Sequence, residues 1–252
     1  MKSIILAKPG CLLLLACCIA ACATQPVSSG RVNPGLQQKQ GLIRTVMILP
    51  AVVHVEALSA GGVHEEQEEW SRQAERNVIT AIEEQLKAKS GLQIEYLSPD
   101  LLPQETKANL AETQALFDAV NISILLHTYG SEPARFPDKV NNFDYSLGME
   151  VNKLAGQADA LLIVRAEDHI STESRKALQV ASVVLGALVG VVVVPAGGTT
   201  VASAALVDAQ NGSLLWYNWI GSSGGYDLRE AASTNSLIEG LLVNFPVRRP
   251  SP

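Results

Sequence analysis

The chain has 252 residues, of which 47% are hydrophobic, and a formal net charge of −6 at pH 7. An acidic chain excludes a nucleic-acid partner, because such a partner requires a basic face. All four cysteines lie within the first 22 residues. This placement excludes a disulfide-stapled domain, and it excludes a thiol nucleophile or cysteine-ligated zinc site in the rest of the chain.

The first 21 residues have the parts of a secretory signal peptide. Lys2 and Lys8 provide a positive start, residues 10–19 form a short apolar core, and two alanines precede Cys22. That core is roughly half of the ~20 residues that a helix needs to span a bilayer, so we expect the segment to be removed. Because it holds two lysines and no acidic residue, its removal takes the net charge from −6 to −8.

Residues 19–22, Ile-Ala-Ala-Cys, resemble the lipobox of bacterial lipoproteins. The resemblance implies cleavage before Cys22 and a membrane anchor made by lipid on that cysteine, so the bilayer is an expected partner. Residues 14–17, Leu-Leu-Ala-Cys, fit nearly as well and leave Cys17 as the alternative. An ordinary signal peptide with incidental cysteines is the other alternative. Ala23, rather than aspartate, after the cysteine implies the periplasmic face of an outer membrane.

Residues 22–41 are rich in Gln, Ser, Gly and Pro, a composition that cannot bury a core. We therefore expect a flexible tether there. One α/β domain is expected over residues 42–247, followed by a short tail over residues 248–252.

Strand and helix patterns alternate through the first part of this domain. Residues 45–55 are apolar and β-branched and predict a strand with a bend at Pro50. Residues 65–89 repeat apolar positions at spacings of three and four, which is typical of an amphipathic helix. The next predicted elements are a strand over 93–97, a helix over 104–118, a strand or helix end over 122–127, a loop over 129–143, a helix over 146–155 and a buried strand over 160–166.

The C-terminal part carries the clearest motif. Residues 199–207 and 213–220 predict two strands joined by a turn, because Asn211-Gly212 between apolar runs is a strong hairpin signal. Asp208 opens this turn and Trp216 lies in the returning strand. A helix over 227–243 follows. Together these patterns predict an α/β fold with a single mixed β-sheet, flanking helices, and a C-terminal β-hairpin plus helix.

Two stretches carry a family resemblance. GQADALLIVRAEDH (156–169) and ASAALVDAQNGSLLWYN (202–218) resemble periplasmic lipoproteins whose domain is similar to the TolB amino-terminal domain, a group that includes the curli secretion channels. The resemblance implies a non-enzymatic accessory of envelope assembly or secretion that works with other envelope proteins and as a homo-oligomer. It brings no catalytic residues with it, because a hairpin motif identifies a fold and not an activity.

Residues 177–194 form an apolar run in which only Gln179 and Ser182 are polar. As a helix the run would be about 27 Å long, near the lower limit for a bilayer span. One interpretation is a crossover helix packed on the sheet, breaking into a strand at its final valines. The other is a membrane-inserting or oligomer-forming element, in which Gly186 and Gly190 allow close helix contact.

The sequence signals for catalytic and metal-binding residues are weak. Residues 221–225, Gly-Ser-Ser-Gly-Gly, match the G-x-S-x-G pattern, but the last histidine, His169, precedes them and a hydrolase of that type requires a later one. Glu167 and Asp168 are expected only to end a buried strand at solvent. The histidines at 54, 64, 127 and 169 are isolated in sequence, so no metal site and no cofactor is expected.

Two functional hypotheses follow. The first is a membrane-anchored, non-catalytic interaction or assembly module of a cell-envelope complex. The second is a component of a secretion or pore apparatus in which residues 177–194 contact or enter the membrane.

Overall fold

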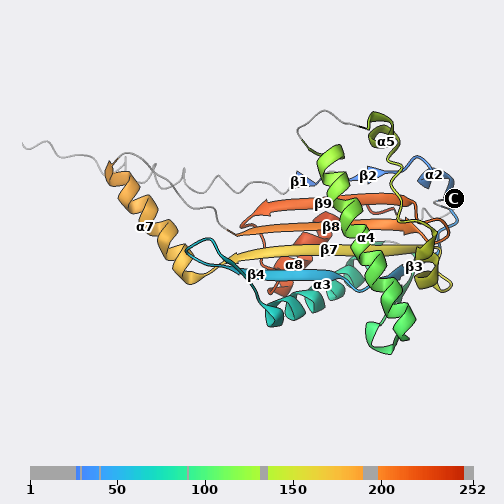
Figure 1. Cartoon of the computed structure of the whole chain (residues 1–252), viewed down its shortest axis with the longest axis horizontal. Helices are drawn as coiled ribbons and strands as arrows, with labels where there is room; N and C mark the ends of the chain where they lie inside the picture. Colours follow the sequence, from blue (N-terminus) through green and yellow to red (C-terminus); the bar gives the residue numbers. More distant parts are fainter. Residues whose placement is uncertain are drawn as a thin grey trace, which may run out of the picture.

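The computed structural model describes residues 27–28, 30–39, 41–89, 91–130, 136–189 and 198–246, and it has three layers (Figure 1). Helices α3 (Glu68–Lys89) and α8 (Ala231–Leu241) cover one face of a single sheet. Helix α4 (Gln104–Thr128) crosses the other face. This arrangement confirms the predicted α/β class, with one mixed sheet, flanking helices and a C-terminal hairpin plus helix.

Nine strands form the sheet within the described residues. They are β1 (Val27–Ser28), β2 (Arg31–Val32), β3 (Thr45–Ile48), β4 (Val52–Leu58), β5 (His64–Glu66), β6 (Gln93–Tyr96), β7 (Ala160–Ser171), β8 (Thr199–Asp208) and β9 (Leu214–Ser223). The shorter helices are α2 (Leu36–Lys39), α5 (Pro137–Asn142), α6 (Asn152–Ala155) and α7 (Glu173–Val189), with 3-10 turns at Pro99–Leu101 and Met149–Val151. The segment 122–127 is thus the end of a long helix, and α5 lies within the predicted loop 129–143.

Strand β7 is the centre of the sheet. It pairs in parallel with β3 and β4 on one side and antiparallel with β8 on the other, and the hairpin β8–β9 continues the sheet. The bend predicted at Pro50 divides residues 45–55 into β3 and β4, which both lie along β7. Proline has no backbone N–H for the ladder, so the strand breaks where it occurs.

Alternation along β7 separates two cores. Leu162, Val164 and Ala166 face α3 and α8, whereas Leu161 and Ile163 face α4. A strand covered on both faces is apolar throughout, which is why the first half of β7 is a continuous apolar run. The second half is different, because polar side chains replace the apolar ones on the α4 face.

The flexible tether predicted over residues 22–41 is wrong for the described residues of that stretch. Strands β1 and β2 pair antiparallel with β9, and the Asn33 amide donates to the Leu215 carbonyl at 3.0 Å. Leu36 is buried in the core. Backbone pairing with an open sheet edge requires no apolar run, so composition gave no sign of it. Cys22 and Cys17 lie outside the described residues, as does the predicted tail.

The apolar run at 177–194 begins as the helix α7, whose described part ends at Val189, and residues 190–194 lie outside the described part. The prediction that this helix packs on the sheet is wrong for its described side chains. Val180 is 65% exposed and Leu178 and Val183 are also exposed, because α7 projects away from one end of the sheet (Figure 1). Strands β7 and β8 are antiparallel neighbours, so their connection needs no crossover.

Within the described residues, we find no helix that combines the length and the hydrophobicity needed to cross a bilayer.

Candidate functional site

The predicted hairpin residues have structural roles. Asp208 Oδ1 accepts hydrogen bonds from the amides of Gln210 and Asn211 at 2.8 and 3.3 Å, while Oδ2 pairs with Lys39. Gly212 has φ +72°, and a Cβ there would lie 2.0 Å from the Gly148 carbonyl oxygen, so only glycine fits. These contacts fix the turn, and they account for Asp208 and Gly212 without a ligand.

Trp216 is fully buried against Phe245, with ring centroids 5.2 Å apart. The motif residue is therefore part of the core.

The G-x-S-x-G match does not form a strand-to-helix elbow. Ser222 and Ser223 are the last two residues of β9, and they pair with Thr200 and Thr199 of β8. A nucleophile elbow places its serine at a sharp turn after the strand. These serines are therefore explained by the sheet ladder.

The prediction that Asp168 ends the strand at solvent is wrong, because its side chain is buried, with 1% exposure. It accepts hydrogen bonds from the Thr200 hydroxyl at 2.7 Å and the Leu228 amide at 2.9 Å, on the side of the sheet covered by α3 and α8. Burial raises the pKa of this carboxyl above its usual range, although the two hydrogen bonds oppose the shift. Asp168 thus ties the loop before α8 to the central strand.

The raised pKa of Asp168 predicts a specific pH dependence of stability. A carboxyl whose native pKa is raised contributes stability below its unfolded pKa of about 4, and that stability is lost as the pH rises through the native value. Asparagine accepts from the Leu228 amide and donates to Thr200, so Asp168→Asn keeps both contacts without the charge. We expect the wild type to lose stability relative to Asp168→Asn as the pH rises from 4 to 7 in urea unfolding. A constant difference would contradict this prediction.

Polar side chains gather on the half of the sheet that α4 leaves uncovered. Arg165, Glu167 and His169 alternate along β7 with residues that face the opposite core. A groove of about 270 Å³ lies between this strand and α4. Arg165 forms ion pairs with Asp118 at 2.6 Å and Glu167 at 2.9 Å, so its charge is balanced within the groove.

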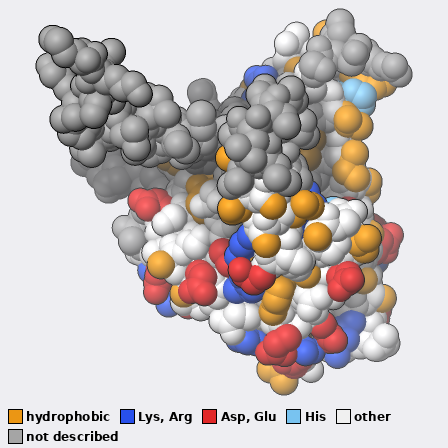
Figure 2. Space-filling view, turned by 90° about the vertical axis from the view of Figure 1, so that its left-hand side faces the viewer, with side chains coloured by type: hydrophobic (Ala, Val, Ile, Leu, Met, Phe, Trp, Pro, Cys, Tyr) orange, Lys and Arg blue, Asp and Glu red, His pale blue; other side chains and the backbone are white. Residues whose placement is uncertain are grey.

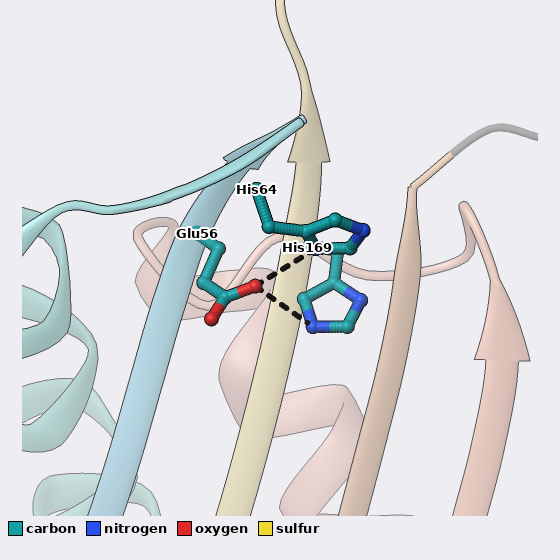
Figure 3. A group of neighbouring side chains, drawn as sticks. All are labelled: Glu56, His64 and His169. Carbon is teal, nitrogen blue, oxygen red and sulfur yellow. Dashed lines mark hydrogen bonds and ion pairs between the residues drawn. The ribbon is translucent and has the colours of Figure 1, made fainter. Parts of the chain in front are cut away.

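Glu56, His64 and His169 meet at the end of this surface, and we call them the strand-end cluster (Figure 3). They come from β4, β5 and β7. Glu56 Oε2 lies 2.8 Å from His64 Nδ1 and 3.3 Å from His169 Nε2. The two imidazole rings pack edge to face with centroids 4.5 Å apart. On its other side, His169 Nδ1 lies 3.0 Å from the Thr199 hydroxyl oxygen.

The expectation that the four histidines are isolated is wrong for His64 and His169. The register of the sheet brings the two histidines together. Glu56 lies directly opposite His169 on β7 and Glu66 on β5, and His64 is diagonal to Glu56 across the β4–β5 pair. His54, on the same face, lies 3.2 Å from Glu66 Oε1 instead. Spacing along the chain does not show such a cluster, although strand alternation places each member on one face once the register is known.

The base of α7 lies beside the strand-end cluster and is held in place. The Thr172 amide and hydroxyl both donate to the Leu58 carbonyl, at 3.0 and 3.1 Å. Arg175 Nη1 donates to the Ser59 carbonyl at 3.1 Å. The first turn of α7 is thus bound to the β4–β5 hairpin, and this fixes the direction in which the helix leaves the sheet.

Helix α4 is apolar on two sides. Leu110, Phe117 and Ile124 are buried against the sheet. The opposite side carries an outer row, Ile122 and Leu126, which lie one helical turn apart and are 57% and 60% exposed. Seen from the end at which α7 projects, hydrophobic side chains form a column along the right-hand edge, the side on which α4 lies (Figure 2). Nothing within the described residues covers this row.

The fold and these surfaces define a three-layer α/β protein with a single mixed sheet. No protein-family model matches the chain, and no curated protein matches it. Among solved structures, it is similar to the PelC dodecamer from Paraburkholderia phytofirmans, with 12% identity and a TM-score of 0.40, covering 90% of this chain and 100% of that one. A point variant of that dodecamer matches with the same identity and coverage and a TM-score of 0.41. Likeness at this level carries no information about function.

Proposed function

We propose that the protein is a non-catalytic interaction module of the cell envelope, anchored through lipidated Cys22 to the periplasmic face of the outer membrane. In this role it assembles with other envelope proteins and with copies of itself. The observation that supports this proposal is the outer row of α4.

A helix on the surface of a monomer has one apolar face and one polar face. Helix α4 departs from this rule, because its inner side packs on the sheet and Ile122 and Leu126 point outward. Contiguous exposed apolar side chains of this kind mark protein interfaces. Arg165 beside them has its charge balanced by Asp118 and Glu167, as suits a surface that loses water on association.

A second candidate function is supported by α7. In this reading the protein belongs to a secretion or pore apparatus, and residues 177–194 contact or enter the membrane. Val27 pairs with Gly221 near the end of β9, and α7 leaves the sheet at that same end. Five peptide bonds separate Cys22 from Val27, a reach of at most about 18 Å. A lipid on Cys22 would therefore keep exposed Leu178, Val180 and Val183 close to the bilayer.

The interaction module is tested by placing charge in the outer row. We expect Ile122→Asp/Leu126→Asp to weaken assembly of the full-length protein in mild detergent by about 30-fold or more, because loss of a central interface side chain costs about 2 kcal/mol or more. Sedimentation velocity measures the mass, and cross-linking in cells captures other partners. Both positions are exposed, so circular dichroism of the variant should match that of the wild type.

Ala232→Asp/Ser236→Asp is the matched control, because it adds the same two charges at exposed positions of α8, on the opposite face of the sheet from the outer row. This control should assemble like the wild type. If the wild type sediments as one chain and cross-links to no neighbour in cells, the interaction module is ruled out.

A further inference from the structure

We propose that the strand-end cluster is a zinc site in which Glu56 Oε2, His64 Nδ1 and His169 Nε2 bind the metal. Two imidazole nitrogens and one carboxylate oxygen suit Zn²⁺, whereas Ca²⁺ and Mg²⁺ prefer sites made entirely of oxygen. This assignment goes beyond the proposed function and does not depend on it.

The distances fit a metal of this size. Ligand atoms around a tetrahedral zinc ion lie about 3.3 Å apart when the bonds are about 2.0–2.1 Å long. Glu56 Oε2 is 3.3 Å from His169 Nε2 and 2.8 Å from His64 Nδ1, and the three ligand atoms all lie within 4.8 Å of one another. Small side-chain rotations therefore suffice to bind the ion, without movement of the strands.

A neighbouring residue orients His169, one of the three ligands. Thr199 Oγ1 lies 3.0 Å from His169 Nδ1, and this hydroxyl accepts a hydrogen bond when Nδ1 carries the ring proton. The lone pair is then on Nε2, the nitrogen that faces Glu56. Metal-binding histidines usually have such a partner on their second nitrogen, which fixes the tautomer and the ring orientation.

The charges on this face favour a cation. Glu56 and Glu66 lie directly opposite each other on β4 and β5, and like charges in this position destabilise a strand pair. A divalent ion on Glu56 would relieve the repulsion. His64 also lies on β5, which pairs only with β4 among the described strands. Zinc would therefore link an outer strand to the central strand β7 and stiffen the hairpin that holds α7.

Three protein ligands leave one coordination position open. The side chains of the cluster remain partly exposed, with His64 the most exposed of the three at 44%. The open position therefore faces solvent and would hold water.

The test is zinc binding by the full-length protein, expressed with a tag that contains no histidine, purified in detergent and stripped with EDTA. Calorimetric titration with ZnCl₂ should find a site that Glu56→Ala, His64→Ala and His169→Ala each remove. Cobalt in place of zinc should give the visible absorption of a four-coordinate ion. Thr199→Val should weaken binding about 10- to 100-fold, the usual effect of removing a partner of a metal ligand.

His54→Ala is the control, because His54 lies on the same face but contacts Glu66 outside the cluster. It should bind zinc like the wild type, and the N-terminal cysteines are identical in all these proteins. Zinc should raise the melting temperature of the wild type and of His54→Ala but not that of His169→Ala. Equal binding by the wild type and His169→Ala, or no saturable binding by the wild type, would overturn the proposal.

Discussion

Cys22→Ser is expected to abolish incorporation of palmitate and to move the protein from the membrane fraction to the soluble periplasmic fraction. Each buried methylene contributes about 0.8 kcal/mol, so loss of the two or three acyl chains proposed for Cys22 would remove a near-permanent anchor. Radiolabelled palmitate in growing cells measures the modification. Fractionation after a high-salt wash measures the attachment.

Cys17→Ser is the matched control, and it should stay labelled and membrane-bound. Loss of label from this variant instead of Cys22→Ser would move the anchor to Cys17. A Cys22→Ser protein that resists the wash would support the membrane role of α7. In that case Leu178→Asp, Val180→Asp and Val183→Asp, added together to Cys22→Ser, should release it, because all three side chains are exposed and their replacement leaves the core intact.

Trp216→Ala is expected to lower the free energy of unfolding by about 3–5 kcal/mol, the usual cost of deleting a large buried aromatic side chain. Trp216 is fully buried in the core between the sheet and α8. It packs edge to face on Phe245, near the end of the described chain. Urea unfolding of the full-length protein, followed by far-ultraviolet circular dichroism, measures the loss.

Trp216→Phe separates ring packing from hydrogen bonding. Among the described residues none accepts a hydrogen bond from Trp216 Nε1, so phenylalanine loses volume but no such bond. We expect Trp216→Phe to cost clearly less than Trp216→Ala. Similar losses for the two variants would show that the indole N–H, through a water molecule, contributes most of the stability.

Much of the fold follows from local patterns in the sequence. Asn211-Gly212 specifies a turn that few other residue pairs can form, and the hairpin β8–β9 follows from it. The three-and-four spacing of apolar residues predicts a helix over 65–89, of which α3 forms residues 68–89 while residues 64–66 form β5. Pro50 lies in the break between β3 and β4. These features are visible because each depends on residues that are neighbours in the chain.

Features that depend on distant pairing were not predictable in the same way. An apolar helix that packs on a sheet and an apolar helix that projects from it have the same composition, so the sequence could not show that α7 projects with Leu178, Val180 and Val183 exposed. Likewise, His64 and His169 become neighbours through the pairing of β4 with β5 and of β4 with β7, and a short stretch of sequence does not show how these strands align. The sequence predicts that Asp168 ends the strand at solvent, because nothing in it shows that β7 continues to Ser171.

The pairing of the N-terminal strands with β9 also determines how the domain would bear mechanical load. Strands β1 and β2 run antiparallel to β9, so β1 begins, at Val27, near the end at which β9 stops. A pull on Val27 from an anchor beyond that end of the sheet would act along the strand axis, at right angles to the interstrand hydrogen bonds. The bonds are then sheared together and not opened one by one. Such an attachment would resist force from the proposed membrane anchor far better than two short strands would if they were peeled from the edge.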